Sequence, residues 1–314
     1  MVASLLASAF LLSAAAAPVP VILDTDLGDD IDDTWALAML LGSPQVDVRL
    51  IVTASDDTET KTRLVAKILE KMGRADIPLA KGVKNSDNKI HQAQWLGDYQ
   101  LAQYKGTVID DGVGALIDTV KKSPNRTTLC VIGPQTNIKA ALERDASISE
   151  KARVVLMAGS VYVGYDGKPE RSPEWNVVKD VLAAKAVFAA PWEITMAPLD
   201  ICGTLRLAGP PYLAVKNSTN PLASVTIENY ELWANRKHHP AESSSVLFDT
   251  AAAYLTFDES LMEIETVHLS IDEKGNTMPD EKGRPVRCAL RWKDRDAFEA
   301  LLVSALTSPD AKAK

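Results

Sequence analysis

Six aspartates crowd into ten residues near the beginning of the chain. They lie within Val21–Leu40, "VILDTDLGDDIDDTWALAML", at positions 24, 26, 29, 30, 32 and 33. An apolar run precedes the cluster and another follows it, so the carboxylates stand between a predicted core strand and a predicted helix. Neighbouring carboxylates repel one another by about 1 kcal/mol per pair even in water. A hard divalent cation takes oxygen ligands and relieves this repulsion, so the segment predicts a metal site.

Helix capping, an EF-hand loop or a phosphatase motif would account for less of the cluster. Capping explains one or two aspartates, and a capping or supporting role stays open for Asp24 and Asp29. An EF-hand loop counted from Asp24 requires Gly at its sixth place and Glu at its twelfth, where the chain has Asp29 and Trp35. A phosphatase of the haloacid-dehalogenase type begins with D-x-D-x-[TV], but Gly28 stands at the fifth place. That type remains a weaker alternative.

The elements around the cluster predict an α/β fold. Short apolar runs rich in β-branched residues predict strands at 19–23, 46–53, 128–132, 152–157 and 193–196. Segments of helical periodicity lie between them at 33–41, 58–72, 108–122, 137–144 and 178–189. This alternation predicts a mostly parallel central sheet flanked by helices. Ligands bind beyond the carboxyl ends of such strands, which is where the aspartates lie.

The last third of the chain has a different pattern. A proline-rich, loop-like region follows residue 205, and helices are predicted at 225–236 and 249–255. Segments 267–272 and 284–291 predict a C-terminal hairpin, and 296–306 predicts a closing helix. The sequence has neither an internal repeat nor a long linker. We therefore expect a single domain over residues 18–314.

Composition and the N-terminus restrict partners and location. The 314 residues carry a formal net charge of −8 without a basic tract, which argues against nucleic-acid binding.

Residues 1–17 contain the apolar stretch Leu5–Leu12 followed by small residues, which is typical of a signal peptide and predicts a secreted or periplasmic protein. No other run reaches the roughly 18 apolar residues of a membrane span. Three cysteines without a C-x-x-C pair give no support for zinc. Homo-oligomerisation is compatible with the sequence.

The aspartate segment resembles the N-terminal signature of the inosine–uridine-preferring nucleoside hydrolase family, D-x-D-P-G-x-D-D-A. Five later segments resemble family segments in the same order: "VIGPQTNIKAAL" (131–142), "ARVVLMAGS" (152–160), "PEWN" with "DVLAAKAVF" (173–188), "ITMAPLDIC" (194–202) and "VLFDTAAAYLTFDESLM" (246–262). The resemblance covers residues 19 to about 303 and implies a Rossmann-like nucleoside hydrolase fold.

The resemblance implies a calcium ion that holds and activates a water for attack on the anomeric carbon of a ribonucleoside. The implied ligands are Asp26, Asp33, the carbonyl of Thr136, and Asp249. The implied general base is Asp32. Two carboxyl groups with a held water also suit the inverting cleavage of a glycosidic bond. However, "DLGDDIDD" is two residues longer than the family pattern, so alignment by distance from Asp26 makes Asp30 the base instead.

The resemblance also implies how the nucleoside is held. Glu174 and Asn176 match residues that hydrogen-bond ribose hydroxyls, although they could merely cap the following helix. Trp175 is expected under the sugar or in the core. His239 is a candidate to protonate the departing base. Tyr230 and Trp233 could stack on a nucleobase or pack in the core.

Several family residues are replaced. Phe248 stands in place of a histidine, Lys168 in place of an asparagine, and Ser55 or Asp56 in place of another. We therefore expect a Ca²⁺-dependent hydrolase that cleaves small-molecule nucleosides into base and ribose. The alternative is a catalytically impaired nucleoside- or ribose-binding protein of the same fold.

Overall fold

The computed structural model describes residues 17–237, 240 and 242–308. Residues 1–16 of the predicted signal peptide (1–17) and the candidate His239 lie outside the described residues. All strands of the described part belong to one ten-stranded sheet, in the order β4-β3-β2-β1-β5-β6-β7-β10-β8-β9. The strands are β1 (Val19–Thr25), β2 (Val46–Thr53), β3 (Leu79–Lys81), β4 (Val108–Ile109), β5 (Thr127–Val131), β6 (Ala152–Met157), β7 (Ile194–Ala197), β8 (Met262–Ile271), β9 (Thr277–Pro279) and β10 (Arg284–Trp292).

The helices fall between these strands and after β7. The α-helices are α1 (Asp32–Gly42), α2 (Thr58–Lys71), α3 (Gly112–Lys122), α4 (Thr136–Arg144), α5 (Ile148–Lys151), α6 (Trp175–Lys179), α7 (Val181–Ala189), α8 (Leu199–Cys202), α9 (Pro210–Lys216), α10 (Pro221–Lys237), α11 (Phe248–Leu255) and α12 (Arg295–Thr307). Short 3₁₀ helices are η1 (His91–Leu96), η2 (Leu101–Gln103) and η3 (Tyr165–Gly167). Within the described chain, no helix is both long and apolar enough to cross a membrane.

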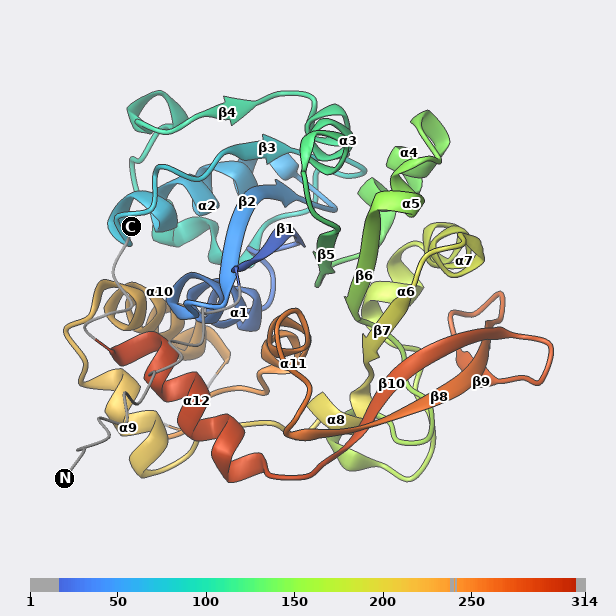
Figure 1. Ribbon diagram of the computed structural model, residues 1–314. Helices are drawn as coiled ribbons and strands as arrows, with labels where there is room; N and C mark the ends of the chain where they lie inside the picture. The colour runs from blue at the N-terminus through green and yellow to red at the C-terminus, as the bar shows by residue number, and fades with distance from the viewer. Residues whose placement is uncertain (1–16, 238–239, 241, 309–314) are drawn as a thin grey trace, which may run out of the picture.

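The order of the strands creates a switch point beside β1. From β1 the chain forms β2, β3 and β4 on one side, then returns to add β5, β6 and β7 on the other, all parallel. β10 joins β7 in parallel, β8 pairs antiparallel with β10, and β9 pairs antiparallel with β8 (Figure 1). Crossovers that leave β1 in opposite directions open a crevice at its carboxyl end, and the aspartate segment follows that end.

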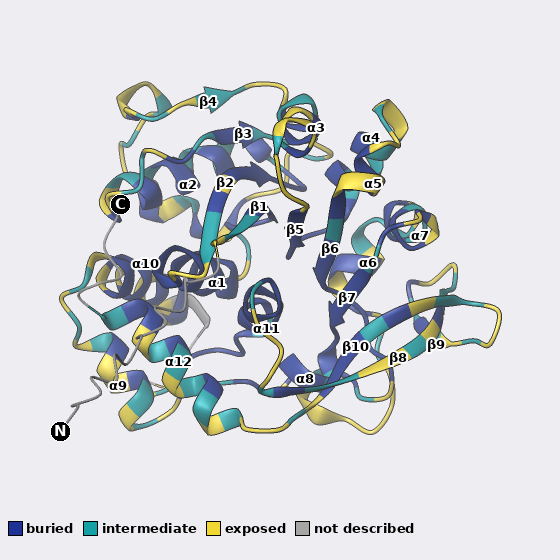
Figure 2. Ribbon diagram, in the orientation of Figure 1, coloured by how far each residue is buried: buried dark blue, intermediate teal, exposed yellow. Residues whose placement is uncertain are grey.

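Two apolar cores cover the two faces of the sheet. Val21 and Leu23 of β1 pack on the side of α1, α2, α10, α11 and α12, while Ile22 packs on the side of α3, α4 and α7. Because successive side chains of a strand point to opposite faces, an apolar run without alternation indicates burial on both sides. Every residue of α1 is buried (Figure 2). The start of α1 is therefore held firmly beneath the crevice.

The predicted fold class is confirmed, with local differences. The helix predicted at 108–122 begins only at Gly112, because Val108 and Ile109 pair with β3 as the edge strand β4. The helix predicted at 178–189 is two helices, broken at Asp180, whose side chain caps α7. The turn-rich part of the hairpin contains β9, and α9 begins at Pro210 inside the region expected to be loop.

Candidate active site

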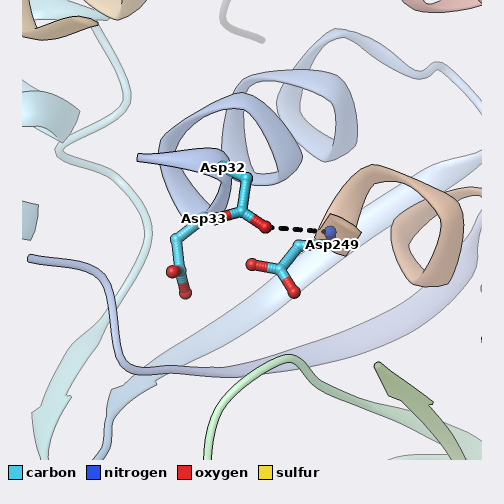
Figure 3. A group of neighbouring side chains, drawn as sticks. All are labelled: Asp32, Asp33 and Asp249. Atoms are coloured by element: carbon cyan, nitrogen blue, oxygen red, sulfur yellow. Dashed lines mark hydrogen bonds between the residues drawn. The ribbon is translucent and has the colours of Figure 1, made fainter. Parts of the chain in front are cut away.

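Three buried carboxylates converge from two helices at the crevice. Asp32 and Asp33 begin α1, and Asp249 lies in the first turn of α11. One oxygen of each lies within 4.8 Å of the other two (Figure 3). The main-chain amide of Asp249 donates a hydrogen bond to Oδ2 of Asp32 at 3.2 Å. The structure thus brings together three of the predicted residues.

The aspartates at the end of β1 differ in position. Asp26 is buried and lines the same cavity. A Cβ on Gly133 would lie within about 3 Å of Asp26, so glycine permits this close approach. Asp24 does not line the cavity: its Oδ2 accepts from Asn137 Nδ2 at 2.8 Å, while its Oδ1 is buried without a partner among the described residues. Thr25 donates its hydroxyl to Asp33. Asp24 therefore has a supporting position.

The four buried carboxylates of Asp26, Asp32, Asp33 and Asp249 form no direct ion pair with a described residue. Burial, reinforced by neighbouring carboxylates, raises the pKa of Asp26 to about 6 and the pKa values of Asp32, Asp33 and Asp249 well above the usual range. Among the ion pairs of the described residues, none includes these four aspartates. Buried carboxylates normally have a cationic partner or a metal. The donor set is all oxygen and anionic, which fits a hard divalent cation such as Ca²⁺.

The extended turn adds two more carboxylates to the cavity wall. Asp29 accepts from the ammonium of Lys61 at 2.9 Å, and its main-chain carbonyl accepts from Trp233 Nε1 at 3.1 Å. Asp30 is exposed, and its main-chain carbonyl accepts from the side-chain amide of Gln92. Burial and then the charge of Asp30 raise the pKa of Asp32. Both candidate bases thus line the cavity, Asp32 buried within it and Asp30 at the rim.

Glu174 and Asn176 line the same cavity. Glu174 caps α6 by accepting from the amides of Asn176 and Val177, and it also accepts from the amide of Gly159. Burial raises its pKa to about 7. Asn176 Nδ2 donates to the carbonyls of Ile132 and Met157 at 3.0 and 3.1 Å. The capping role considered for Glu174 is therefore present, and the same residue reaches the cavity.

Trp175 lies at the rim and not in the core. Its side chain is 56% exposed, and the ammonium of Lys179 lies 5.2 Å from the ring centre. Lys179 in turn forms an ion pair with Asp56 at 3.1 Å. Asp56 has a left-handed backbone with φ of 52°, and Ser86 and Asn88 also donate to its carboxylate. Despite its burial, these donors lower the pKa of Asp56 to about 2.

Thr136 is not brought to the cavity. It begins α4, and its hydroxyl donates to Asp180 at 2.8 Å. Main-chain carbonyls of a helix are directed into the helix's own hydrogen bonds, so the position of Thr136 does not support its carbonyl as the cation ligand that the resemblance implied. The segment instead reaches the cavity four residues earlier, at Ile132, whose carbonyl accepts from Asn176.

Several aromatic and basic residues of the cavity have no signature in the sequence. The cavity has a volume of about 620 Å³, and its lining includes residues that no motif marked: Tyr165, Arg206 and Lys89, together with Lys179. Phe248 also lines it, edge-to-face with Tyr165.

Tyr230 and Trp233, which were expected to stack on a nucleobase or pack in the core, differ in position. Trp233 lines the cavity, whereas Tyr230 is buried in the core and donates to the Ser243 carbonyl.

The fold and site define an α/β protein with a carboxylate-rich cavity at the switch point of its sheet. The family model described as inosine-uridine preferring nucleoside hydrolase matches residues 21–303. The chain is 28% identical over 313 residues to the "Inosine-uridine preferring nucleoside hydrolase" of Crithidia fasciculata, covering 92% of this chain and 98% of that protein. It is 26% identical to "Probable uridine nucleosidase 2" of Arabidopsis thaliana, over 88% of this chain and 90% of that one.

A solved structure shares the fold. "Plant nucleoside hydrolase - PpNRh1 enzyme" superposes with a TM-score of 0.80 at 24% identity, covering 93% of this chain and all of the other. The chain belongs to the inosine-uridine preferring nucleoside hydrolase family, whose members are N-ribosyl hydrolases. It is therefore an enzyme of the glycosidase class.

Proposed function

We propose that the protein hydrolyses the N-glycosidic bond of ribonucleosides to free base and ribose, in a reaction that depends on Ca²⁺. The observation that carries the proposal is the convergence of three buried carboxylates in a cavity that also contains Glu174 and Asn176. Relatives named for inosine, uridine and pyrimidine nucleosides support a nucleoside substrate.

The cation would be held by the side chains of Asp26, Asp33 and Asp249. The carbonyl of Ile132 is a main-chain acceptor available to the same cation, since Ile132 lines the cavity and Asn176 occupies only part of that oxygen's capacity. A bound Ca²⁺ supplies a fixed position for a water and lowers the pKa of that water.

Asp32 is the proposed general base. Its pKa lies well above that of a free aspartate because of burial and the nearby Asp30. A raised pKa makes the carboxylate a stronger proton acceptor near neutral pH. Asp30 remains the alternative base, because it lines the same cavity.

Glu174 and Asn176 would hold the sugar. The Nδ2 atom of Asn176 is occupied by two main-chain carbonyls, which leaves its Oδ1 to accept from a ribose hydroxyl. Oε1 of Glu174 accepts from one amide only, so it keeps a further lone pair that suits a second hydroxyl, whereas Oε2 already accepts from two amides. The rings of Tyr165, Trp175 and Phe248 offer faces or edges to a nucleobase.

A second candidate function is binding without turnover. Phe248 places an aromatic ring next to Asp249, where it supplies no proton to a departing base. Retention of the carboxylates favours the hydrolase.

A panel of purine and pyrimidine ribonucleosides, incubated with purified protein in Ca²⁺ and in EDTA, tests the proposal. Free base and reducing sugar are measured in parallel. We expect release in Ca²⁺ that EDTA suppresses and added Ca²⁺ restores. Ribose or nucleoside binding without release would establish the binding protein, and phosphate release from p-nitrophenyl phosphate would favour the phosphatase alternative.

We also propose that residues 1–17 are removed as a signal peptide and that the mature protein is secreted or periplasmic. The apolar stretch and the small residues after it support this proposal. Sequencing of the mature N-terminus after expression in the native host tests it. Retention of Met1 in a cytosolic fraction would contradict it.

A further inference from the structure

Lys61 buries a full positive charge next to the acidic turn. Its side chain has no exposed surface. It lies on α2, the helix that begins shortly after β2. Its ammonium donates to Asp29 Oδ2 at 2.9 Å and to the Ala54 carbonyl at 3.3 Å. A buried ammonium is costly unless charges and hydrogen bonds surround it. The surroundings of Lys61 therefore have to supply negative charge.

The stem of Lys61 is fixed by close packing. A Cβ on Gly28 would lie 3.3 Å from Lys61 Cγ and 3.3 Å from Leu64 Cδ1. Gly28 also has a φ of +133°, a conformation that residues with a side chain rarely adopt. The extended turn therefore lies directly on the lysine stem, and the ammonium has little freedom to move away from the site.

The charge of Lys61 also affects carboxylates to which the lysine is not hydrogen-bonded. Burial raises the pKa values of Asp26 and Asp33, and the lysine acts against this by favouring their ionised forms. Those two carboxylates, with Asp29, in turn hold the lysine in its charged form despite burial. Asp29 itself lies on the segment that is two residues longer than the family pattern. The extension and the buried lysine thus form one charged unit beside the carboxylate centre.

We propose that Lys61 is a resident counter-cation of the carboxylate centre. Its fixed ammonium balances Asp26 and Asp33 when no divalent cation is bound, and it opposes that cation electrostatically when one binds. Asp29 moderates this opposition by pairing with the ammonium. The inference rests on the proposed cation site. Its consequence is a site that stays folded without Ca²⁺ and binds Ca²⁺ less tightly than its carboxylates alone would.

The test measures Ca²⁺ affinity by calorimetry at one alkaline pH, and thermal unfolding in EDTA, on the purified protein. For Lys61→Met we expect Ca²⁺ binding about tenfold tighter or more, because the variant lacks the electrostatic repulsion between the ammonium and the divalent ion, which is strong in a low-dielectric site. We also expect a lower unfolding temperature in EDTA. A defect of packing alone would lower the unfolding temperature without tightening Ca²⁺ binding.

Charge-balanced variants separate the charge from the packing. Lys61→Met with Asp29→Asn has the wild-type net charge but lacks the ion pair, and we expect its Ca²⁺ affinity to stay within about threefold of wild type, since the two charge effects are of similar size. Asp29→Asn alone removes the ion-pair partner of the ammonium and should bind Ca²⁺ about tenfold more weakly, which supplies the test if Lys61→Met does not fold. Lys71→Met, on the same helix with an exposed partner Glu228, is the control and should change neither quantity.

The outcomes are distinct for the two proposals. Absence of Ca²⁺ binding by the wild-type protein would overturn the cation site itself. Wild-type binding together with unchanged or weaker binding by Lys61→Met, or unchanged binding by Asp29→Asn, would overturn the role of Lys61 and leave the cation site standing.

Discussion

The main-chain amide of Asp249 donates to the carboxylate of Asp32 across 217 positions of sequence. This bond joins the first turn of α11 to the first turn of α1 and fixes how the two helices present their carboxylates (Figure 3). Asp32 is therefore both a partner of the main chain and a titratable group of the cavity. Substitutions at Asp32 must separate these two roles.

Asp32→Asn should abolish most turnover and preserve cation binding. The amide oxygen of Asn still accepts from Asp249, but Asn cannot take a proton. Since general bases contribute roughly 10²–10⁴-fold, we expect kcat to fall by about that factor and the Ca²⁺ dissociation constant to change by less than about threefold. Asp30→Asn is the matched comparison. If it alone produces this loss, Asp30 is the base.

Asp33→Asn and Asp249→Asn should weaken cation binding itself. Each substitution removes one charged oxygen from a group whose three members lie within 4.8 Å of one another. We expect the Ca²⁺ dissociation constant to rise by about tenfold or more, with activity recovered in part at high Ca²⁺. Calorimetry and Ca²⁺-dependent rates measure this. Equal affinity in both variants and wild type would remove these residues from the cation site.

The cation-free protein should become more stable as the pH falls from about 8 to about 5. The pKa of Asp26 is raised to about 6 from the usual 3.8, and those of Asp32, Asp33 and Asp249 are raised well above it. A raised pKa gives stability that is complete below the unfolded value and is lost as the pH rises through the folded value. Asp56, whose pKa is about 2, changes stability only below this window.

Saturating Ca²⁺ should reverse or flatten this dependence, because the cation binds the deprotonated carboxylates. Thermal unfolding in EDTA and in Ca²⁺ across the same pH series provides the comparison. A cation-free protein that is most stable at the alkaline end of the series would contradict the raised pKa values.

Lys179→Met should weaken substrate binding more than it slows the chemical step. Lys179 lies at the end of α6, the helix whose N-cap is Glu174, and its ion pair joins this helix to Asp56 in the loop after β2. Loss of this ion pair loosens the wall proposed for the sugar, so we expect KM to rise about three- to tenfold with kcat changed by less than about threefold. Lys185→Met, whose partner Glu273 is exposed, should leave both parameters unchanged.

The parts of the site that have a local signature could be predicted from the sequence. The spacing of aspartates and the family segments point to Asp32, Asp33 and Asp249, which the structure brings together. The family motif points to the carbonyl of Thr136, which lies in α4, whereas Ile132 lines the cavity. The letters of a motif do not show where the chain turns away into a helix. The helix predicted over 108–122 included β4, since two residues are too few to show a period.

The basic residues of the site could be found only in part. Lys61 precedes Leu64, Val65 and Ile68 at helical spacing, so it falls on the apolar face of α2, and this signal marks it as buried. Nothing comparable marks Lys179, whose partner Asp56 lies 123 positions away. Such pairs depend on the three-dimensional arrangement of loops.

The joining of α1 to α11 also bears on how the enzyme is made. Asp32 is synthesised early and Asp249 late, and the carboxylate group exists only once both are folded together. A ribosome-bound or truncated copy that ends before α11 lacks one wall of the centre. Such an unfinished copy should be inert toward the nucleosides of the cell that makes it, because the carboxylate group is completed only by Asp249, 217 positions after Asp32.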